Sequence, residues 1–173
     1  MMKLLLINAK PSLADALATH NGVNVATLLP RKHSFSKLCP SRRIEAITYA
    51  GGGKLNPLAI LQVRRIIREL RPDIVHASYG RALAHVILAT TALRSPPKIV
   101  SFRGIASPMS KLDAGNWISY QHSRVDGHAC ESDAVRDTMI RSGVQPERCW
   151  TIYNSMSCWP TERPGRAALK QFG

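Results

Sequence analysis

The chain has 173 residues, and its 45% hydrophobic content is typical of one soluble globular domain rather than of a disordered segment. The formal net charge of +13 is unusual and favours phosphate-bearing partners: nucleic acid, an anionic membrane surface or a phosphorylated ligand. The alternative is a merely solvated basic surface. No apolar run approaches the roughly 20 residues of a membrane-spanning helix, and the first residues lack a signal-peptide core. We therefore expect a cytoplasmic protein.

The four cysteines agree with that location. Cys39, Cys130, Cys149 and Cys158 form no C-x-x-C pair and match no metal-binding spacing. In a chain without a secretory signal, such cysteines are expected to be free thiols in a reducing compartment.

Apolar strand-like segments alternate with helix-like segments along the whole chain. Strands are expected at residues 3–7, 23–29, 44–49, 73–77, 98–103, 125–130 and 148–153. Helices are expected at residues 12–19, 57–70, 81–93, 117–124 and 132–142. Ser12, Asn56 and Ser132 are the expected N-caps of three of these helices. The alternation predicts a three-layer, Rossmann-like α/β domain with a mostly parallel central sheet.

The stretch from residue 72 to residue 104 organises this prediction. It reads as a strand, a crossover helix and a second strand, all apolar, which is typical of a parallel sheet covered on both faces. Ligands of such sheets bind beyond the carboxyl ends of the strands. The functional site is therefore expected at two turns, residues 76–80 and 103–107.

Several familiar site motifs are absent. Gly51–Gly53 with Lys54 does not form a phosphate-binding loop, because Thr48 and Leu55 stand where that motif needs glycine and a hydroxyl residue. The first strand is not followed by a dinucleotide-binding glycine motif, and there is no nucleophile elbow. His122, His128 and Cys130 fit no metal spacing. No metal and no cofactor are expected.

The strand ends supply the candidate residues. Arg103, followed by Gly104, can present a planar guanidinium to a phosphate or carboxylate, although it could instead pair with an acid within the fold. Tyr79 and Gly80 follow a neighbouring strand. His76 lies inside that strand, where a hydrogen-bonded core histidine is favoured over a ligand. Asn154 ends the last strand, where it could also serve only as a turn residue.

A basic loop precedes the third strand. It combines cations with two apolar side chains that could insert into an anionic membrane surface. Its proposed membrane-contacting residues are Arg31, Lys32, Phe35, Lys37, Leu38, Arg42 and Arg43. Sequence-specific nucleic-acid binding is disfavoured, because no known nucleic-acid-binding signature is present and aromatic residues are scarce.

Three stretches, DIVHASYGRALAHVILA, KIVSFRG and VDGHACESDAVRDTMIRSGVQPERCWTIYNSM, resemble the N-terminal half of glycosyltransferase family 4 (group 1) enzymes. The resemblance covers most of the chain and is clearest over residues 125–154. It implies one half of a GT-B fold, with residues 1–156 forming the acceptor-side domain. Residues 157–173 would then be the linker and the start of a C-terminal donor-binding domain that is missing here.

The resemblance also implies a function. Such enzymes transfer a sugar with retention from a nucleotide-sugar donor, typically without a metal. The expected acceptor is an envelope glycan, such as a polysaccharide or lipopolysaccharide, or a lipid-linked acceptor at the inner face of the cytoplasmic membrane. A fragment without the second domain is expected to be inactive. The alternatives are a non-catalytic basic module that binds nucleic acid and another GT-B relative, such as a sugar-nucleotide epimerase.

The resemblance assigns site residues as well. Arg103 stands where the family usually has histidine, and is the predicted catalytic residue. It would offer charge rather than act as a base, because arginine does not deprotonate. The turn Asn8-Ala-Lys10 replaces a usual glycine pair. The predicted acceptor- or donor-binding residues are Asn8, Lys10, Tyr79, Gly80, Gly104, Ser132 and Asn154.

Overall fold

The computed structural model describes residues 1–30, 44–110 and 113–153. These residues form a seven-stranded sheet in the order β3-β2-β1-β4-β5-β6-β7, and every pair of neighbouring strands is parallel. The strands are β1 (Met2–Ile7), β2 (Val23–Pro30), β3 (Glu45–Tyr49), β4 (Ile74–Ser78), β5 (Lys98–Arg103), β6 (Gly127–Cys130) and β7 (Cys149–Thr151). The predicted three-layer, Rossmann-like α/β fold is confirmed.

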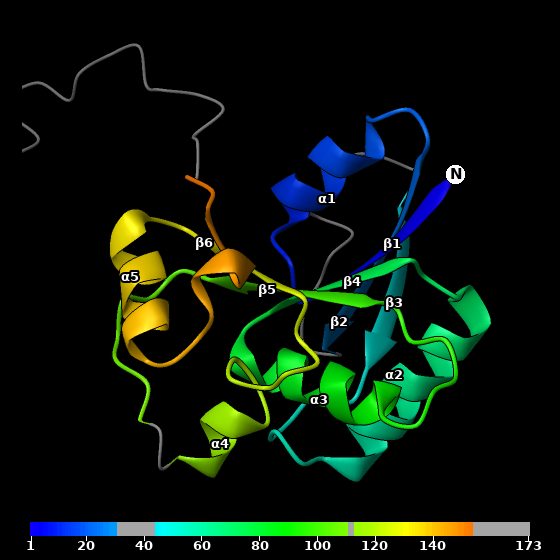
Figure 1. The fold of residues 1–173 in the computed structure, drawn as a ribbon. Helices are drawn as coiled ribbons and strands as arrows, with labels where there is room; N and C mark the ends of the chain where they lie inside the picture. Colours follow the sequence, from blue (N-terminus) through cyan, green and yellow to red (C-terminus); the bar gives the residue numbers. More distant parts are fainter. Residues whose placement is uncertain (31–43, 111–112, 154–173) are drawn as a thin grey trace, which may run out of the picture.

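Helices connect consecutive strands except β2 and β3, whose connection lies mostly outside the described residues. They are α1 (Pro11–Ala18), α2 (Pro57–Leu70), α3 (Gly80–Thr90), α4 (Ala114–Trp117) and α5 (Asp133–Arg141), and a 3-10 turn (Pro146–Arg148) precedes β7. Helices α2 and α3 lie together on one side of the sheet, whereas α1 lies on the other side (Figure 1). Helix α5 packs on β6 and β7 through Val135 and Met139.

The pleat of β1 explains the layers. Successive side chains of a strand point to opposite faces. Leu5 and Ile7 accordingly join the cluster that includes Val63 of α2, whereas Leu4 and Leu6 join the cluster on α1. Because Leu4 to Ile7 are buried on both faces, they form an uninterrupted apolar run.

Local signals explain most helix boundaries. The Asn56 side chain accepts a hydrogen bond from the backbone N–H of Leu58 at 3.1 Å, and the Ser132 hydroxyl accepts one from Val135 at 3.3 Å. Both predicted caps are thus confirmed. The third predicted cap is wrong: α1 begins at Pro11, and Lys10 occupies its N-cap without a side-chain bond. Proline at the first helical position has no N–H to satisfy, which places this start one residue before Ser12.

Two further expectations need correction. The helix predicted at residues 117–124 ends where it was expected to begin, since α4 runs from Ala114 to Trp117. The Asp113 carboxylate caps this helix by accepting a hydrogen bond from the N–H of Gly115 at 2.7 Å. Strand β7 is also shorter than predicted and ends at Thr151. The proposed boundary between residues 156 and 157 lies outside the described residues.

Candidate functional site

The topology places a switch point between β1 and β4. The chain leaves β1 for β2 and β3 on one side, then returns to β4 on the other side, so the connections that follow β1 and β4 diverge (Figure 1). In parallel sheets, this divergence opens the crevice in which ligands bind. Asn8 follows β1 and Tyr79 follows β4, and both have a positive φ, of 56° and 72°. The turn predicted at residues 76–80 therefore lies at the expected edge of the sheet, beside the turn at Asn8.

Asn8 is held in place by neighbouring strands. Its backbone N–H donates to the carbonyl of Leu28 at 3.0 Å, and its Nδ2 donates to the Tyr49 hydroxyl at 3.3 Å. Its Oδ1 is buried and has no hydrogen-bond partner among the described residues. A buried acceptor without a partner is costly, so it is a natural position for a ligand hydroxyl to donate a hydrogen bond.

Tyr79 and Gly80 form the start of α3. Tyr79 occupies the N-cap and makes no side-chain cap bond, and its side chain is 61% exposed. The first N–H groups of a helix need acceptors from outside the helix, and they favour negatively charged or strongly polar groups. Gly80 lies against the ring of Tyr120, where an added Cβ would be 3.1 Å from Cε2. The α3 N-terminus is therefore exposed on one side and closed by Tyr120 on the other.

Arg103 ends β5 with its guanidinium turned toward the loop that follows. Nε donates to the carbonyl of Ile105 at 3.0 Å, and Nη2 donates to the carbonyl and hydroxyl of Ser107 at 2.7 and 3.1 Å. The guanidinium carbon also lies 4.9 Å from the centre of the Tyr120 ring. Arg103 is only 9% exposed. This geometry makes Arg103 the residue that shapes the loop at this strand end.

Tyr120 joins the two turns that the sequence singled out. It contacts Arg103 and Gly80, and Tyr79 acts on it electrostatically. Burial raises the pKa of the Tyr120 hydroxyl, and Arg103 partly offsets this effect. Arg103 and Tyr79 thus lie on the same rim of the sheet.

Glu131 lies directly after β6 and contacts two of the predicted site residues. Its carboxylate lies against Gly104 and 4.0 Å from the Lys10 ammonium, while its backbone N–H donates to the carbonyl of Arg103 at 3.0 Å. Two predicted site residues from different strand ends, Lys10 and Gly104, therefore meet at one acid.

Ser132 serves as the N-cap of α5, and the next residue, Asp133, accepts two side-chain hydrogen bonds. The Asp133 carboxylate accepts hydrogen bonds from the Thr151 hydroxyl at 2.6 Å and the Tyr153 hydroxyl at 2.5 Å. Both bonds lower the pKa of Asp133, and the bond from Thr151 has the largest effect. Ser132 and Asp133 thus connect α5 to the chain that leaves β7.

The comparison that decides the family is a sequence match. The model of Glycosyltransferase Family 4 matches residues 12–158, which is most of the chain. The chain belongs to glycosyltransferase family 4. Among curated proteins, none matches it.

Solved structures share the fold of this family 4 chain. Anabaena Alr3699/HepE in complex with UDP-glucose is 20% identical, with a TM-score of 0.70, over 99% of this chain and 50% of that protein. The lipopolysaccharide outer core galactosyltransferase WaaB is 15% identical, with a TM-score of 0.69, over 92% of this chain and 47% of that protein.

Epimerases share the fold as well. The UDP-GlcNAc 2-epimerase of Neisseria meningitidis, bound to UDP-GlcNAc, is 10% identical, with a TM-score of 0.60, over 87% of this chain and 45% of that protein. This family 4 chain therefore spans about half the length of the structures that it matches.

Histidines of the family 4 chain pack under the rim. His128 contacts the Ser101 hydroxyl through Nδ1 at 2.7 Å, and His76 contacts the Ser78 hydroxyl through Nε2 at 3.4 Å. Burial lowers the pKa of each imidazole to about 4. Both side chains are therefore neutral at physiological pH, and the expectation of a hydrogen-bonded histidine at position 76 is confirmed.

Some predictions fall outside the residues that the structure describes. They concern Asn154 and the whole proposed membrane loop: Arg31, Lys32, Phe35, Lys37, Leu38, Arg42 and Arg43. Within the described ranges, no group of three His, Cys, Asp or Glu side chains is arranged to hold a metal ion, and no helix is long and apolar enough to span a membrane.

Sequence reasoning missed Tyr120, Glu131 and Tyr49. The rule that led to Arg103 could also have found Glu131, since it directly follows a strand. No sequence signal marks Tyr120, because its role depends on a turn that brings it against two distant strand ends.

Proposed function

We propose that this chain is the acceptor-side, N-terminal domain of a retaining glycosyltransferase. It would act with a C-terminal domain that binds a nucleotide-sugar donor, and would be inactive alone. Membership of family 4 supports this proposal, as do two structures of similar fold, a UDP-glucose complex and a lipopolysaccharide galactosyltransferase. The proposed acceptor is an envelope glycan or a lipid-linked glycan.

The observation that carries the proposal is the unpaired, buried Oδ1 of Asn8 at the switch point. A sugar hydroxyl is a neutral donor of the right kind for this amide oxygen. The exposed α3 N-terminus lies at the end of the neighbouring strand, where its N–H groups can receive hydroxyl or phosphate oxygens. In this proposal Asn8, Tyr79 and Gly80 orient the acceptor, while Lys10, Gly104 and Ser132 extend the same binding edge. Asn154 stays a proposed binding residue outside the described part of the chain.

Arg103 keeps its proposed place in the site. Its charge lies under the rim, where it can stabilise negative charge that develops on the leaving phosphate. It supplies no proton, since the guanidinium stays charged. The chemistry this chain performs is therefore orientation and electrostatic stabilisation, with no metal in the proposed mechanism.

The test compares two asparagines of the complete enzyme. Asn8→Gly removes the amide but permits the positive φ, whereas Asn24→Gly removes an exposed amide near the start of β2, at the opposite edge of the sheet. With UDP-sugar donors and a glycan acceptor, we expect Asn8→Gly to lower kcat/KM at least about tenfold, as loss of a buried polar contact does. Asn24→Gly should change it less than about twofold.

Equal rates for Asn8→Gly and wild type would remove Asn8 from the site. The anomeric configuration of the product, measured by NMR, tests retention separately. Sugar transfer by the 173-residue chain alone would contradict the proposed division of labour.

The epimerase alternative has a specific basis in the matching UDP-GlcNAc 2-epimerase structures. Incubation of the complete enzyme with UDP-GlcNAc in the absence of an acceptor separates the two functions. Conversion to the 2-epimer would favour the epimerase, and turnover that requires a glycan acceptor would favour the transferase.

A further inference from the structure

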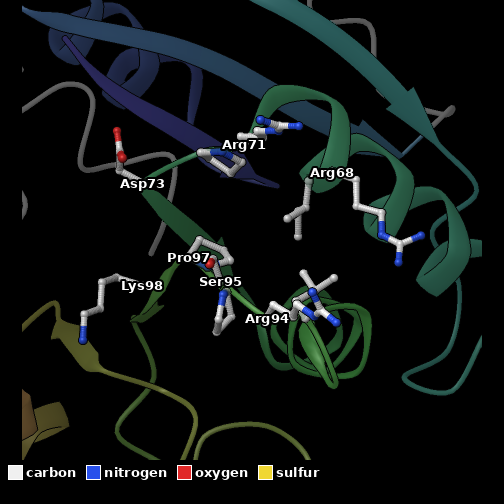
Figure 2. Close-up of a pocket in the computed structure, with 11 residues that line it drawn as sticks. Arg68, Arg71, Asp73, Arg94, Ser95, Pro97 and Lys98 are labelled. Carbon is white, nitrogen blue, oxygen red and sulfur yellow. The ribbon is translucent and has the colours of Figure 1, made fainter.

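A second concave surface lies at the opposite edge of the sheet from the candidate active site. A hollow of about 770 Å³ opens where α2 ends before β4 and where the turn after α3 leads into β5 (Figure 2). The five residues of β4, at about 3.3 Å each, separate it from the Tyr79 rim. A ligand held here would therefore not reach the reacting groups.

The hollow has an apolar floor and a basic rim. Ile67, Pro72 and Pro97 are buried in its floor. The side chains of Arg68, Arg71 and Arg94 are exposed around it. Figure 2 shows Arg68 and Arg94 on one side of the hollow and Asp73 and Lys98 on the other. The floor can receive the non-polar part of a ligand while the rim binds its charge.

Nearby cations already have partners. Arg64 donates to the carbonyls of Ala89 and Thr91, and Arg65 pairs with Glu69 at 2.7 Å. Lys98 pairs with Asp126 at 2.9 Å.

The three rim arginines differ from these neighbours. The side chains of Arg68, Arg71 and Arg94 have no hydrogen-bond or ion-pair partner within the described part of the chain. The acid in the lining, Asp73, accepts a hydrogen bond from the backbone N–H of Lys3 at 2.7 Å. Among the described residues, three guanidinium groups therefore border this hollow without an ion-pair partner, beside a single carboxylate.

The turns after α2 and α3, which border the hollow, also have an unusual backbone conformation. Arg71 and Ala92 both adopt a positive φ, of 46° and 62°, at positions after α2 and α3 where glycine is the usual residue. The αL conformation costs a non-glycine residue about 1 kcal/mol. Position 71 is an arginine despite this cost, and its side chain lines the hollow.

We propose that this hollow is a second binding site, for a phosphate-bearing anion. Arginine binds phosphate oxygens through paired N–H donors, and three arginines exceed what a single carboxylate can satisfy. The apolar floor favours a phosphate carried on an organic group. That group is either the headgroup of an anionic phospholipid or a soluble phosphate ester.

The test measures binding of inorganic pyrophosphate to the 173-residue chain by titration calorimetry at low ionic strength. The double variant Arg68→Gln/Arg94→Gln removes two unpaired rim charges. The control Arg65→Gln/Arg141→Gln removes the same charge from exposed positions outside the hollow. We expect the first variant to raise Kd at least about tenfold, because charge-assisted hydrogen bonds are lost. The control should raise it less than about twofold.

A second arm identifies the source of the phosphate. Each variant is sedimented with phosphatidylcholine vesicles that contain or lack phosphatidic acid. Loss of vesicle binding specific to the rim variant assigns the site to a lipid headgroup, and loss of pyrophosphate binding alone assigns it to a soluble ester. The single variant Arg94→Gln, in an exposed turn, repeats the measurement if the double variant unfolds.

Two results would overturn the proposal. One is equal loss of binding in the rim and control variants, which would indicate diffuse attraction by the net charge. The other is the absence of saturable binding to both pyrophosphate and anionic vesicles in the wild type.

Discussion

At the scale of single residues, Arg103 shows how a strand-end cation can organise the loop that follows it. Its Nε and Nη2 donors bind Ile105 and Ser107 at the same time. A lysine ammonium cannot reproduce this fork. We therefore expect Arg103→Lys to accelerate hydrogen exchange of the Met109 amide, which donates to the Ser142 hydroxyl at 3.1 Å at the end of this loop, by about tenfold or more, since each lost bond contributes about 1 kcal/mol.

The matched control for that prediction is Ser107→Ala. It removes only the hydroxyl acceptor at 3.1 Å and leaves both carbonyl bonds in place. Exchange measured by mass spectrometry should therefore remain close to wild type. Protection in Arg103→Lys that equals the wild type would contradict the assigned role. A kcat effect of Arg103→Lys without faster exchange would instead support direct action on the substrate.

The sequence predicted the position of these residues but not their partners. Strand periodicity and the rule of carboxyl ends predicted that Arg103 and Tyr79 lie at one edge, and the family resemblance added Asn8. The direction of the Arg103 guanidinium depends on a loop and on Tyr120, which belongs to a turn between α4 and β6. Contacts between segments far apart in the chain leave no periodic signal in either segment.

At the scale of elements, α2 carries an exposed apolar surface in addition to its buried one. Leu58 and Leu61 are 55% and 64% exposed and lie three residues apart, on one side of the helix, beyond the exposed Leu55. This arrangement supports the proposed peripheral contact with an anionic membrane.

The corresponding prediction concerns vesicle binding. Leu58→Ser/Leu61→Ser should lower sedimentation with vesicles that contain phosphatidic acid by about tenfold, because two apolar side chains no longer insert. The control Ile105→Ser/Ile152→Ser alters two equally exposed apolar side chains on other segments. If both variants bind vesicles as the wild type does, α2 is not the contact surface.

Helix starts show where element prediction succeeds. Asn56-Pro57 and Ser132-Asp133 combine a capping side chain with a favourable first turn, and both helices begin there. Between β5 and β6 the outcome differs, because the Asp113 cap starts a short helix whose four residues carry no amphipathic pattern. A single capping bond can thus decide a boundary that periodicity does not mark.

At the scale of the whole molecule, buried neutral histidines make stability depend on pH. His76 and His128 have a folded pKa of about 4, against an ordinary value near 6.5. Between these values the unfolded chain binds more protons than the folded chain, so stability increases with pH in this range. Each neutral histidine contributes roughly 3 kcal/mol to the free energy of unfolding above about pH 6.5. This contribution is lost as the pH falls toward 4.

Urea unfolding at about pH 7.5 and about pH 5 measures this loss. We expect the midpoint to fall at the lower pH, and His128→Gln to make the fall smaller because one of the histidines with a lowered pKa is gone. His20→Gln, at an exposed position, should leave the pH dependence unchanged. A midpoint that is the same at both pH values would contradict the predicted protonation.

The central place of β1 has a consequence for synthesis of the protein on the ribosome. This strand is translated before both of its neighbours, and one of them is β4, whose pairing joins Leu4 to Ile74. Until α2 and β4 have been made, the nascent chain carries an apolar segment with an open hydrogen-bonding side. The pairing of β1 with β4 must therefore wait until β4 has been translated. Chaperone contacts with β1 are expected to be released when residue 78 clears the exit tunnel.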